Sequence, residues 1–352
     1  MHSEEFMPSP AKPLEIGQEY PAPGEAEAIA NMTAIIEAGL QTDQEPVRRG
    51  QHAKHHGCVK AEFIVEANLP ENLRVGVFKE PSTFPAWIRF SNGSGNAEQP
   101  DTKGDGRGMT VKLMGVEGKK LLDDEKHTQD FLMINHPVFF VRNIPDYVDL
   151  FNVIKQSPGK APLKFFFPSL NPFKWRLSEF RIIRTIQSSK IGNPLLVQYW
   201  STTPYKLGSQ AMKYSAKPTS PAPENPTISE SENYLREAMV EHLKTKEACF
   251  DFLVQLQSDP VKMPIEDPTI QWDSPFIKVA TIKIPPQTFD SDEQMEFCEH
   301  LSYNPWHSLE AHQPLGGVNR ARNLVYKTIS DRRRELNQVS PQEPNGEERF
   351  PQ

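Results

Sequence analysis

Alternation of apolar and polar residues recurs in short segments along this chain and restricts the folds open to it. In residues 59–66, valine, alanine and phenylalanine alternate with lysine and glutamate. Because successive side chains of a β-strand point to opposite faces, this pattern predicts a half-buried strand. Further strands are predicted at residues 86–95, 108–118, 249–257 and 276–284, and an almost wholly apolar strand covered on both faces at residues 130–143.

Apolar residues at helical spacing predict amphipathic helices in three other segments. These are residues 26–41, 231–246 and 316–336, and the last ends in three arginines, which favour a helix C-terminus. Ser229 or Ser231 is predicted to cap the second helix. Several antiparallel-type strands around a loop-rich, helical middle predict an α+β fold, a closed antiparallel β-barrel with surrounding helices.

Composition predicts one folded domain with a flexible segment at each end of the chain. Residues 1–25 are polar, acidic and rich in proline, which predicts a flexible arm. A single domain is predicted at residues 26–335, with an internal proline-rich linker at 217–230 and a flexible tail at 336–352. Residues 155–217 are rich in aromatics and proline without a clear period, so no element is predicted there.

Charge and hydropathy exclude several classes of partner. The formal net charge of -7 argues against nucleic acid as the main partner. No run of 18 or more apolar residues occurs, and the opening residues lack a signal peptide, so we expect a cytoplasmic protein without stable membrane insertion. Cys58, Cys249 and Cys298 are odd in number and far apart, which predicts buried free thiols.

The segment "HAKHHG" places three histidines immediately before the first predicted strand. His52, His55 and His56 could be metal ligands, a catalytic acid and base, or part of a basic turn. The flanking glycines and the following strand weigh against a helix that would gather ligands on one face. The residues alone therefore favour a basic turn with one buried, hydrogen-bonded histidine.

Two further polar signals lie in apolar surroundings. Asn135 interrupts the apolar segment 130–143, where an amide must be hydrogen-bonded, so it marks either a strand end at Pro137 or a donor aimed into a cavity. Arg322 and Tyr326 are four residues apart on a predicted helix and therefore share a face. A nearby guanidinium favours an ionised phenol, and phenolate is an axial ligand of haem iron in some proteins. The alternative, which is more common for a single pair of this kind, is an exposed arginine beside a partly buried tyrosine.

Five segments, taken in order, resemble the successive motifs of the haem catalases. They are "RRGQHAKHHG", "WIRFSNGSG", "DGRGMTVKL", "NHPVFFVRN" and "RNLVY", which extend from Arg48 to Tyr326. The resemblance is greater to the short catalase-related peroxidases and the catalase-like allene oxide synthases. It implies a barrel of about eight strands that binds haem b.

The resemblance also implies a role for each matching residue. His52 resembles the distal histidine and Asn135 the distal asparagine, while Tyr326 resembles the axial ligand of the haem iron and Arg322 its partner arginine. The remaining haem-binding set is Arg49 and Arg89, which resemble arginines that pair with the propionates, Ser91, which resembles a serine that orients the distal histidine, and Phe139 of "PVFF". His55 and His56 are predicted to be turn residues on the outer side.

Two positions depart from the catalase pattern, and both lie in the distal motifs. Ile134 stands where an ungapped match places the catalase asparagine, and Gln51 stands where catalases carry valine and allene oxide synthases threonine. The resemblance implies a peroxidase or catalase-like enzyme acting on hydrogen peroxide or organic hydroperoxides, with a small-molecule reductant and a homo-oligomeric state. The alternatives are rearrangement of fatty acid hydroperoxides and a non-enzymatic haem-binding protein.

Overall fold

The computed structural model describes residues 13–40, 42, 45–156, 161–220, 222–224, 226 and 228–350. Its strands are β1 (His55–Val65), β2 (Thr83–Asn92), β3 (Arg107–Met114), β4 (Thr128–Ile134), β5 (Tyr199–Trp200), β6 (Tyr205–Leu207), β7 (Gln210–Pro218), β8 (Ala248–Leu256) and β9 (Phe276–Ile284). Its helices include α1 (Glu25–Ala38), α2 (Ile144–Gln156), α3 (Ala161–Phe166), α4 (Leu177–Ser188), α5 (Tyr234–Leu243), α6 (Asp292–His300) and α7 (Gly317–Asn337).

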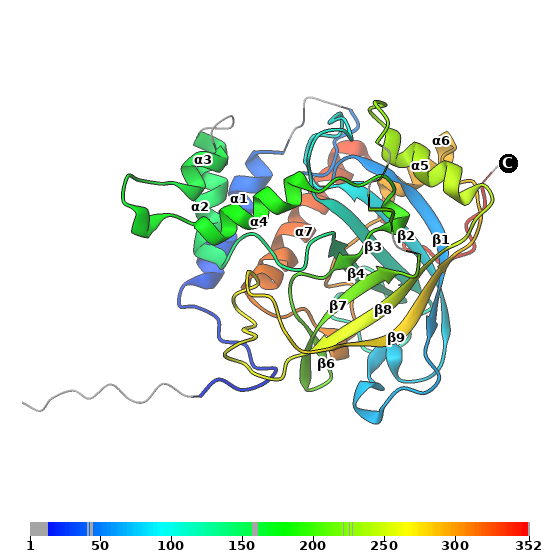
Figure 1. Cartoon of the computed structure of the whole chain (residues 1–352), viewed down its shortest axis with the longest axis horizontal. Helices are drawn as coiled ribbons and strands as arrows, with labels where there is room; N and C mark the ends of the chain where they lie inside the picture. The colour runs from blue at the N-terminus through cyan, green and yellow to red at the C-terminus, as the bar shows by residue number, and fades with distance from the viewer. Residues whose placement is uncertain are drawn as a thin grey trace, which may run out of the picture.

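The strands form one closed antiparallel barrel (Figure 1). Their order is β5-β4-β3-β2-β1-β9-β8-β7-β6, and β5 also pairs with β7. This extra pairing closes a ring of eight strands, while β6 pairs with β7 as an additional hairpin arm. The predicted closed β-barrel with surrounding helices is therefore confirmed.

Aromatic side chains fill the interior of the barrel. The ring of Phe252 lies 5.0 Å from that of Phe63 and 4.9 Å from that of Phe131, and all three are buried. On β8, Phe250, Phe252 and Val254 all face inward, as their alternation predicted. Burial of each such side chain contributes about 1.5–3 kcal/mol, so the barrel interior is a packed core that stabilises the fold.

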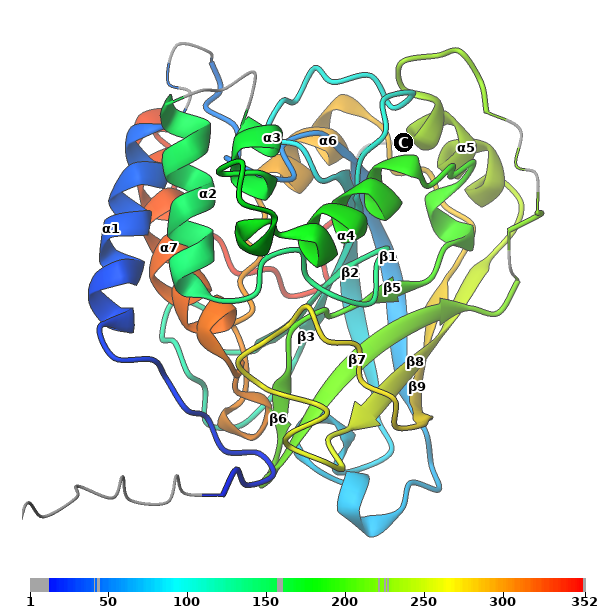
Figure 2. The same cartoon turned by 60° about the vertical axis from the view of Figure 1, so that its left-hand side comes forward.

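Helices α1, α2 and α7 pack together on one side of the barrel (Figure 2). Ile29 and Met32 of α1 contact Ile144 of α2 and Ala321 of α7 in one apolar cluster. This packing fixes α7 relative to α1 and α2, and α7 carries two of the candidate haem-binding residues.

The middle of the chain differs from the sequence-based expectation. Strand β4 ends at Ile134, and residues 135–143 form no strand, since Pro137 lacks the N–H that a ladder needs. The segment without a clear period contains the helices α3 and α4 and the strands β5 to β7, of which β5 and β7 complete the barrel. Helix α5 begins one residue after Asn233, and Ser231 accepts a hydrogen bond from the Asn233 N–H instead of capping the helix.

The expectation of free thiols is wrong for two of the three cysteines. Cys58 on β1 and Cys298 on α6 form a disulfide with their Cα atoms 5.3 Å apart, while Cys249 is free. The two cysteines are 240 residues apart in sequence, so only the packing of α6 against β1 brings them together. Their spacing could not reveal the pair.

The described ends of the chain make specific contacts with the barrel. In the predicted arm, Glu19 and Glu25 form ion pairs with Arg320 of α7. In the predicted tail, the Glu348 carboxylate accepts a hydrogen bond from the Trp87 indole at 3.0 Å. The first 12 residues, positions 221, 225 and 227 of the predicted linker, and the last two residues lie outside the described residues. The domain limits themselves stay predictions.

Candidate functional site

His52 lies in a turn before β1 whose backbone is held on both sides. Its N–H donates to the Gly93 carbonyl at 3.1 Å, and its carbonyl accepts from the Arg89 guanidinium at 2.9 Å. Its φ of 54° is in the left-handed region, which side chains other than asparagine, aspartate and histidine rarely adopt. The surrounding hydrogen bonds therefore impose this conformation and aim the imidazole.

The His52 ring is oriented by strands β2 and β3. Its Nδ1 lies 3.0 Å from the Ser91 hydroxyl, and Ser91 pairs with Gly108 across the two strands. A Cβ on Gly108 would lie 2.7 Å from both His52 Nδ1 and Ser91 Oγ, so the ring occupies space that only glycine leaves. Burial, together with the charges of Arg89 and Arg322, lowers the pKa of His52 to about 4. His52 is thus a neutral base near pH 7.

Asn135 follows the end of β4 and is bound to the start of β3. Its N–H donates to the Arg107 carbonyl at 3.0 Å, and its side-chain oxygen accepts from the Arg107 N–H at 2.6 Å. The next residue on β3, Gly108, contacts His52, so both predicted distal residues converge on this strand end. Ile134 pairs with Gly108 and is half-buried, whereas Gln51 is exposed.

Arg322 and Tyr326 lie one turn apart on α7, as predicted. One Arg322 nitrogen donates to Thr203 at 3.1 Å, and its guanidinium carbon is 5.5 Å from the centre of the Phe139 ring. Burial acts to lower the pKa of Arg322, but the phenols around it, that of Tyr326 foremost, outweigh burial and raise this pKa. Because Arg322 also lowers the pKa of His52, its charge links α7 to the turn that carries His52.

Four arginines gather around one buried carboxylate, that of Glu299 on α6. Its oxygens lie 3.4 Å from Arg48, 3.1 Å from Arg49 and 2.7 Å from Arg333, and Arg89 also acts on it electrostatically. Burial and the charge of Arg49 lower the pKa values of both Arg89 and Arg333 to about 9. The cluster therefore holds more positive than negative charge.

Arg48, Arg333 and Glu299 were not singled out from the sequence as site residues. Arg333 was assigned only to the basic end of a helix, although it follows Tyr326 by seven residues and two helical turns place it on nearly the same face. That spacing was the available signal. Glu299 had none, because α6 reaches the cluster only through tertiary packing.

The prediction that His55 and His56 are turn residues on the outer side is wrong. Strand β1 begins at His55, and both side chains are buried. His56 Nε2 lies 3.0 Å from the Asn92 side-chain oxygen, and burial lowers the pKa of His56 to about 3. His55 Nε2 lies 3.6 Å from the Glu299 carboxylate. A β-bulge between His55 and Gly57 interrupts the regular alternation of side chains at the start of β1.

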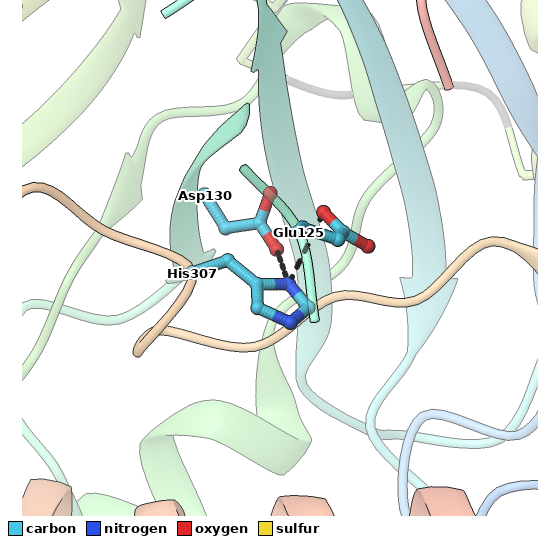
Figure 3. Close-up of side chains that lie close together, drawn as sticks. All are labelled: Glu125, Asp130 and His307. Atoms are coloured by element: carbon cyan, nitrogen blue, oxygen red, sulfur yellow. Dashed lines mark hydrogen bonds and ion pairs between the residues drawn. The ribbon is translucent and has the colours of Figure 1, made fainter. Parts of the chain in front are cut away.

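A second charged cluster comprises Glu125, Asp130 and His307 (Figure 3). Its ligand-type atoms lie within 4.8 Å of one another, a spacing that could hold a cation. The Lys112 ammonium already fills that role, since it contacts Glu125 and lies 2.8 Å from Asp130. Side-chain hydrogen bonds to Asp124 and Asp130 overcome burial and the charge of Lys112 and raise the pKa of His307 to about 9. We interpret the cluster as a charge-compensated ion network.

The closed barrel, with helices packed outside it and His52 at one strand end, defines a protein of the catalase fold. Among solved structures, a bacterial catalase matches with a TM-score of 0.59 at 16% identity, over 96% of this chain and 66% of that chain. Catalase A from Saccharomyces cerevisiae matches with a TM-score of 0.59 at 15% identity, over 95% and 70%. At these identities the comparison shows the fold alone.

Residues 21–168 match the family model Catalase. A catalase-related peroxidase of Mycolicibacterium paratuberculosis is 26% identical over 262 residues, which are 70% of this chain and 76% of that protein. A catalase of Pseudomonas syringae pv. syringae is 28% identical over 117 residues, which are 33% of this chain and only 21% of that protein. The family-model match, the catalase-related peroxidase and the catalase structures together support membership of the catalase superfamily.

No helix in the part of the chain that the structure describes is both long enough and apolar enough to cross a bilayer.

Proposed function

We propose that this protein is a haem-dependent oxidoreductase that cleaves hydrogen peroxide or organic hydroperoxides. The observation that carries the proposal is the neutral, oriented imidazole of His52, which lies in the same electrostatic environment as Arg322 of the Arg322–Tyr326 pair. Membership of the catalase superfamily supports a peroxide-related activity. The catalase-related peroxidase is named for such an activity, and the proposal extends it to this chain.

The residues present fit a haem with two carboxylates. The arginine cluster around Glu299 carries a net positive charge that could pair with the propionates. Within the described residues, the buried Nε of Arg89 has no hydrogen-bond partner. Arg49, Arg89 and Arg333 would hold the propionates through charge-assisted hydrogen bonds. Tyr326 would ligate the haem iron through its phenol oxygen, with the Arg322 guanidinium one helical turn away, and Phe139 would provide apolar contact.

When bound, haem would supply the redox chemistry of peroxide reduction. The His52 imidazole would take the proton from one peroxide oxygen and return it to the other oxygen as that oxygen departs. Ser91 and Gly108 would keep the ring in the orientation that both transfers need. The Asn135 side-chain oxygen is engaged with the Arg107 N–H, so its amide N–H groups would be the donors toward peroxide.

The first test concerns the phenol of Tyr326. We expect the purified protein to bind one haem per chain, and Tyr326→Phe to lose it or to alter its absorption spectrum, because phenylalanine has no oxygen to ligate iron. Titration with hemin followed by absorption spectroscopy measures both. Tyr234→Phe is the matched control, since this buried phenol on α5 donates to the Ile191 carbonyl and has no contact with Arg322. A Tyr326→Phe variant with an unchanged spectrum would disprove the axial role.

The second test concerns the arginine cluster. We expect Arg49→Ala combined with Arg89→Ala to weaken haem affinity by 10-fold or more, because each charge-assisted hydrogen bond contributes about 1.5–3 kcal/mol before solvent exposure is discounted. Arg332→Ala should have no effect, since Arg332 is on the exposed side of α7 and pairs with Glu335. Equal affinities for the double variant and the control would refute the propionate assignment.

We further propose that hydroperoxides are reduced better than hydrogen peroxide is disproportionated. The support is local, because the bulky apolar side chain of Ile134, at the position where an ungapped match places the catalase asparagine, is half-buried beside Gly108. Holding a second hydrogen peroxide between His52 and Asn135 would then be inefficient. Stopped-flow mixing with hydrogen peroxide and with a bulkier hydroperoxide compares the two, and oxygen release at a rate matching substrate consumption would overturn this preference. Rearranged fatty acid products without net reduction would instead indicate an allene oxide synthase.

A further inference from the structure

Two large apolar side chains stand almost completely in solvent on the loop between α3 and α4. Leu170 is 99% exposed and Phe173 is 97% exposed, and Leu163 on α3 is 62% exposed. Figure 1 shows this loop projecting away from the barrel beside α2. Isolated apolar residues on a surface are ordinary, but a group of them at a projecting tip is typical of a surface that contacts an apolar partner.

The loop is anchored beneath its exposed tip. The Trp175 indole donates to the Ser169 carbonyl at 2.8 Å, and the Phe173 N–H donates to the Asn171 side chain at 3.0 Å. Arg176 binds the Phe165 carbonyl at 2.9 Å and pairs with Asp146 on α2 at 2.8 Å. These contacts present Leu170 and Phe173 on a defined scaffold while leaving their side chains in solvent.

The same part of the chain is strongly basic. Residues 160–190 contain seven lysines and arginines and one glutamate, a net charge of 7 − 1 = +6 in a chain whose total is -7. The exposed cations among them, in the part of the chain that the structure describes, include Lys174, Arg181, Arg184 and Lys190. The rest of the chain therefore carries −7 − 6 = −13, so positive charge is concentrated in this segment, in which Arg176 is paired with Asp146 and Asp149 of α2.

We propose that the α3–α4 loop and the basic surface beside it dock the protein on an anionic lipid membrane. Apolar side chains at a tip can insert at the boundary between headgroups and acyl chains, while lysine and arginine side chains contact the anionic headgroups. A nucleic acid would neutralise the cations but leave Leu170 and Phe173 in water. This docking is peripheral, so it needs none of the described helices to cross the bilayer. It is independent of haem binding.

The test is sedimentation of the full chain with lipid vesicles. We expect binding to phosphatidylcholine vesicles that contain about 30% phosphatidylserine, at least about 10-fold weaker binding to phosphatidylcholine alone, and loss of binding as salt rises from about 0.1 M to about 0.5 M. Leu170→Ser with Phe173→Ser should weaken binding by about 10-fold or more, because both side chains lose their burial in lipid. Lys174→Gln with Arg181→Gln should weaken it by about 25-fold, at about five-fold per cation.

Val261→Ser with Lys262→Gln is the matched control. These two residues are a neighbouring apolar and basic pair, 72% and 74% exposed, in a different loop. The control should bind vesicles as the wild type does. Absence of binding by the wild type, equal binding to both vesicle types, or unaltered binding by the loop variants would overturn the proposal. A change in molar mass by light scattering in the loop variants, without a change in vesicle binding, would assign the surface to self-association instead and also overturn it.

Discussion

Replacing His52 is expected to slow the reaction of the haem-loaded protein with any peroxide by about 100-fold or more, the usual contribution of a positioned acid and base. Two variants separate chemistry from backbone strain. His52→Ala removes the imidazole but places alanine at a φ of 54°, whereas His52→Asn removes the base and keeps a residue type that tolerates this conformation. We expect both to lose activity to a similar extent while retaining haem.

The pH profile provides a second readout of the same role. The pKa of His52 is lowered to about 4 by burial and by Arg89 and Arg322, so the base is neutral above this pH. The wild-type rate constant for peroxide should therefore be flat around neutral pH and fall as pH drops toward 4. His127→Ala, which removes an exposed histidine, should keep the wild-type profile. An unimpaired His52→Asn variant would refute the mechanism.

Acidification is expected to destabilise the folded protein strongly below pH 6.5. Burial lowers the pKa of His52 and of His312 to about 4 and that of His56 to about 3, whereas unfolded histidine titrates near 6.5. The unfolded state then binds more protons at acid pH, and the free energy of unfolding falls as pH falls through this window. One pKa unit corresponds to about 1.4 kcal/mol, so the three groups together remove on the order of 10 kcal/mol by pH 4.

His312 offers the clearest test of this linkage. Its Nε2 accepts a hydrogen bond from the Val77 N–H at 3.0 Å, and this bond requires that nitrogen to be unprotonated. We expect His312→Gln to lower stability at neutral pH but to reduce the loss between pH 6.5 and 4 by about 3 kcal/mol. Urea denaturation at several pH values measures both quantities. His242→Gln on the exposed face of α5 is the control, and parallel curves for His312→Gln and the wild type would contradict the assignment.

His307 should have the opposite dependence on pH. Its pKa is raised to about 9 by hydrogen bonds to Asp124 and Asp130, which overcome burial and the charge of Lys112. The contribution of His307 to stability is complete below pH 6.5 and is lost as pH rises through 9. The two effects together place maximum stability close to neutral pH.

Local patterns were sufficient to identify most of the barrel. Periodicity predicted the strands β1, β2, β3, β8 and β9 and the helices α1, α5 and α7. A strand with one buried face has apolar residues at every second position, and a helix with one apolar face has them at every third or fourth position. Strand β7 was missed although Met212, Tyr214 and Ala216 alternate with Lys213, Ser215 and Lys217, because this alternation is short and follows a long segment without a period. Lys213 is nevertheless buried in the structure, where its ammonium lies 5.0 Å from the centre of the Trp272 ring.

The candidate site divides in a similar way. His52, Arg322 and Tyr326 were selected from the sequence because they are polar residues next to recognisable strands and helices, and Asn135 because an amide interrupts an apolar segment. The resemblance to catalases then assigned all four residues to one predicted haem site. Their functional roles stay predictions, although the structure does bring His52, Ser91 and Asn135 to the same end of β3.

The sequence by itself determined the local elements, their order and hence the type of barrel, since these depend on neighbours within about ten residues. Only the tertiary structure decided the Cys58–Cys298 disulfide, the approach of Arg333 and Glu299 to Arg49, and the burial of His56. Each depends on contacts between different elements, separated by 36 residues for His56 and Asn92 and by 240 for the two cysteines, which local periodicity does not encode. The exposure of Leu170 and Phe173 was also decided by the tertiary structure, because apolar residues in a segment without a period can lie on the surface or in the core.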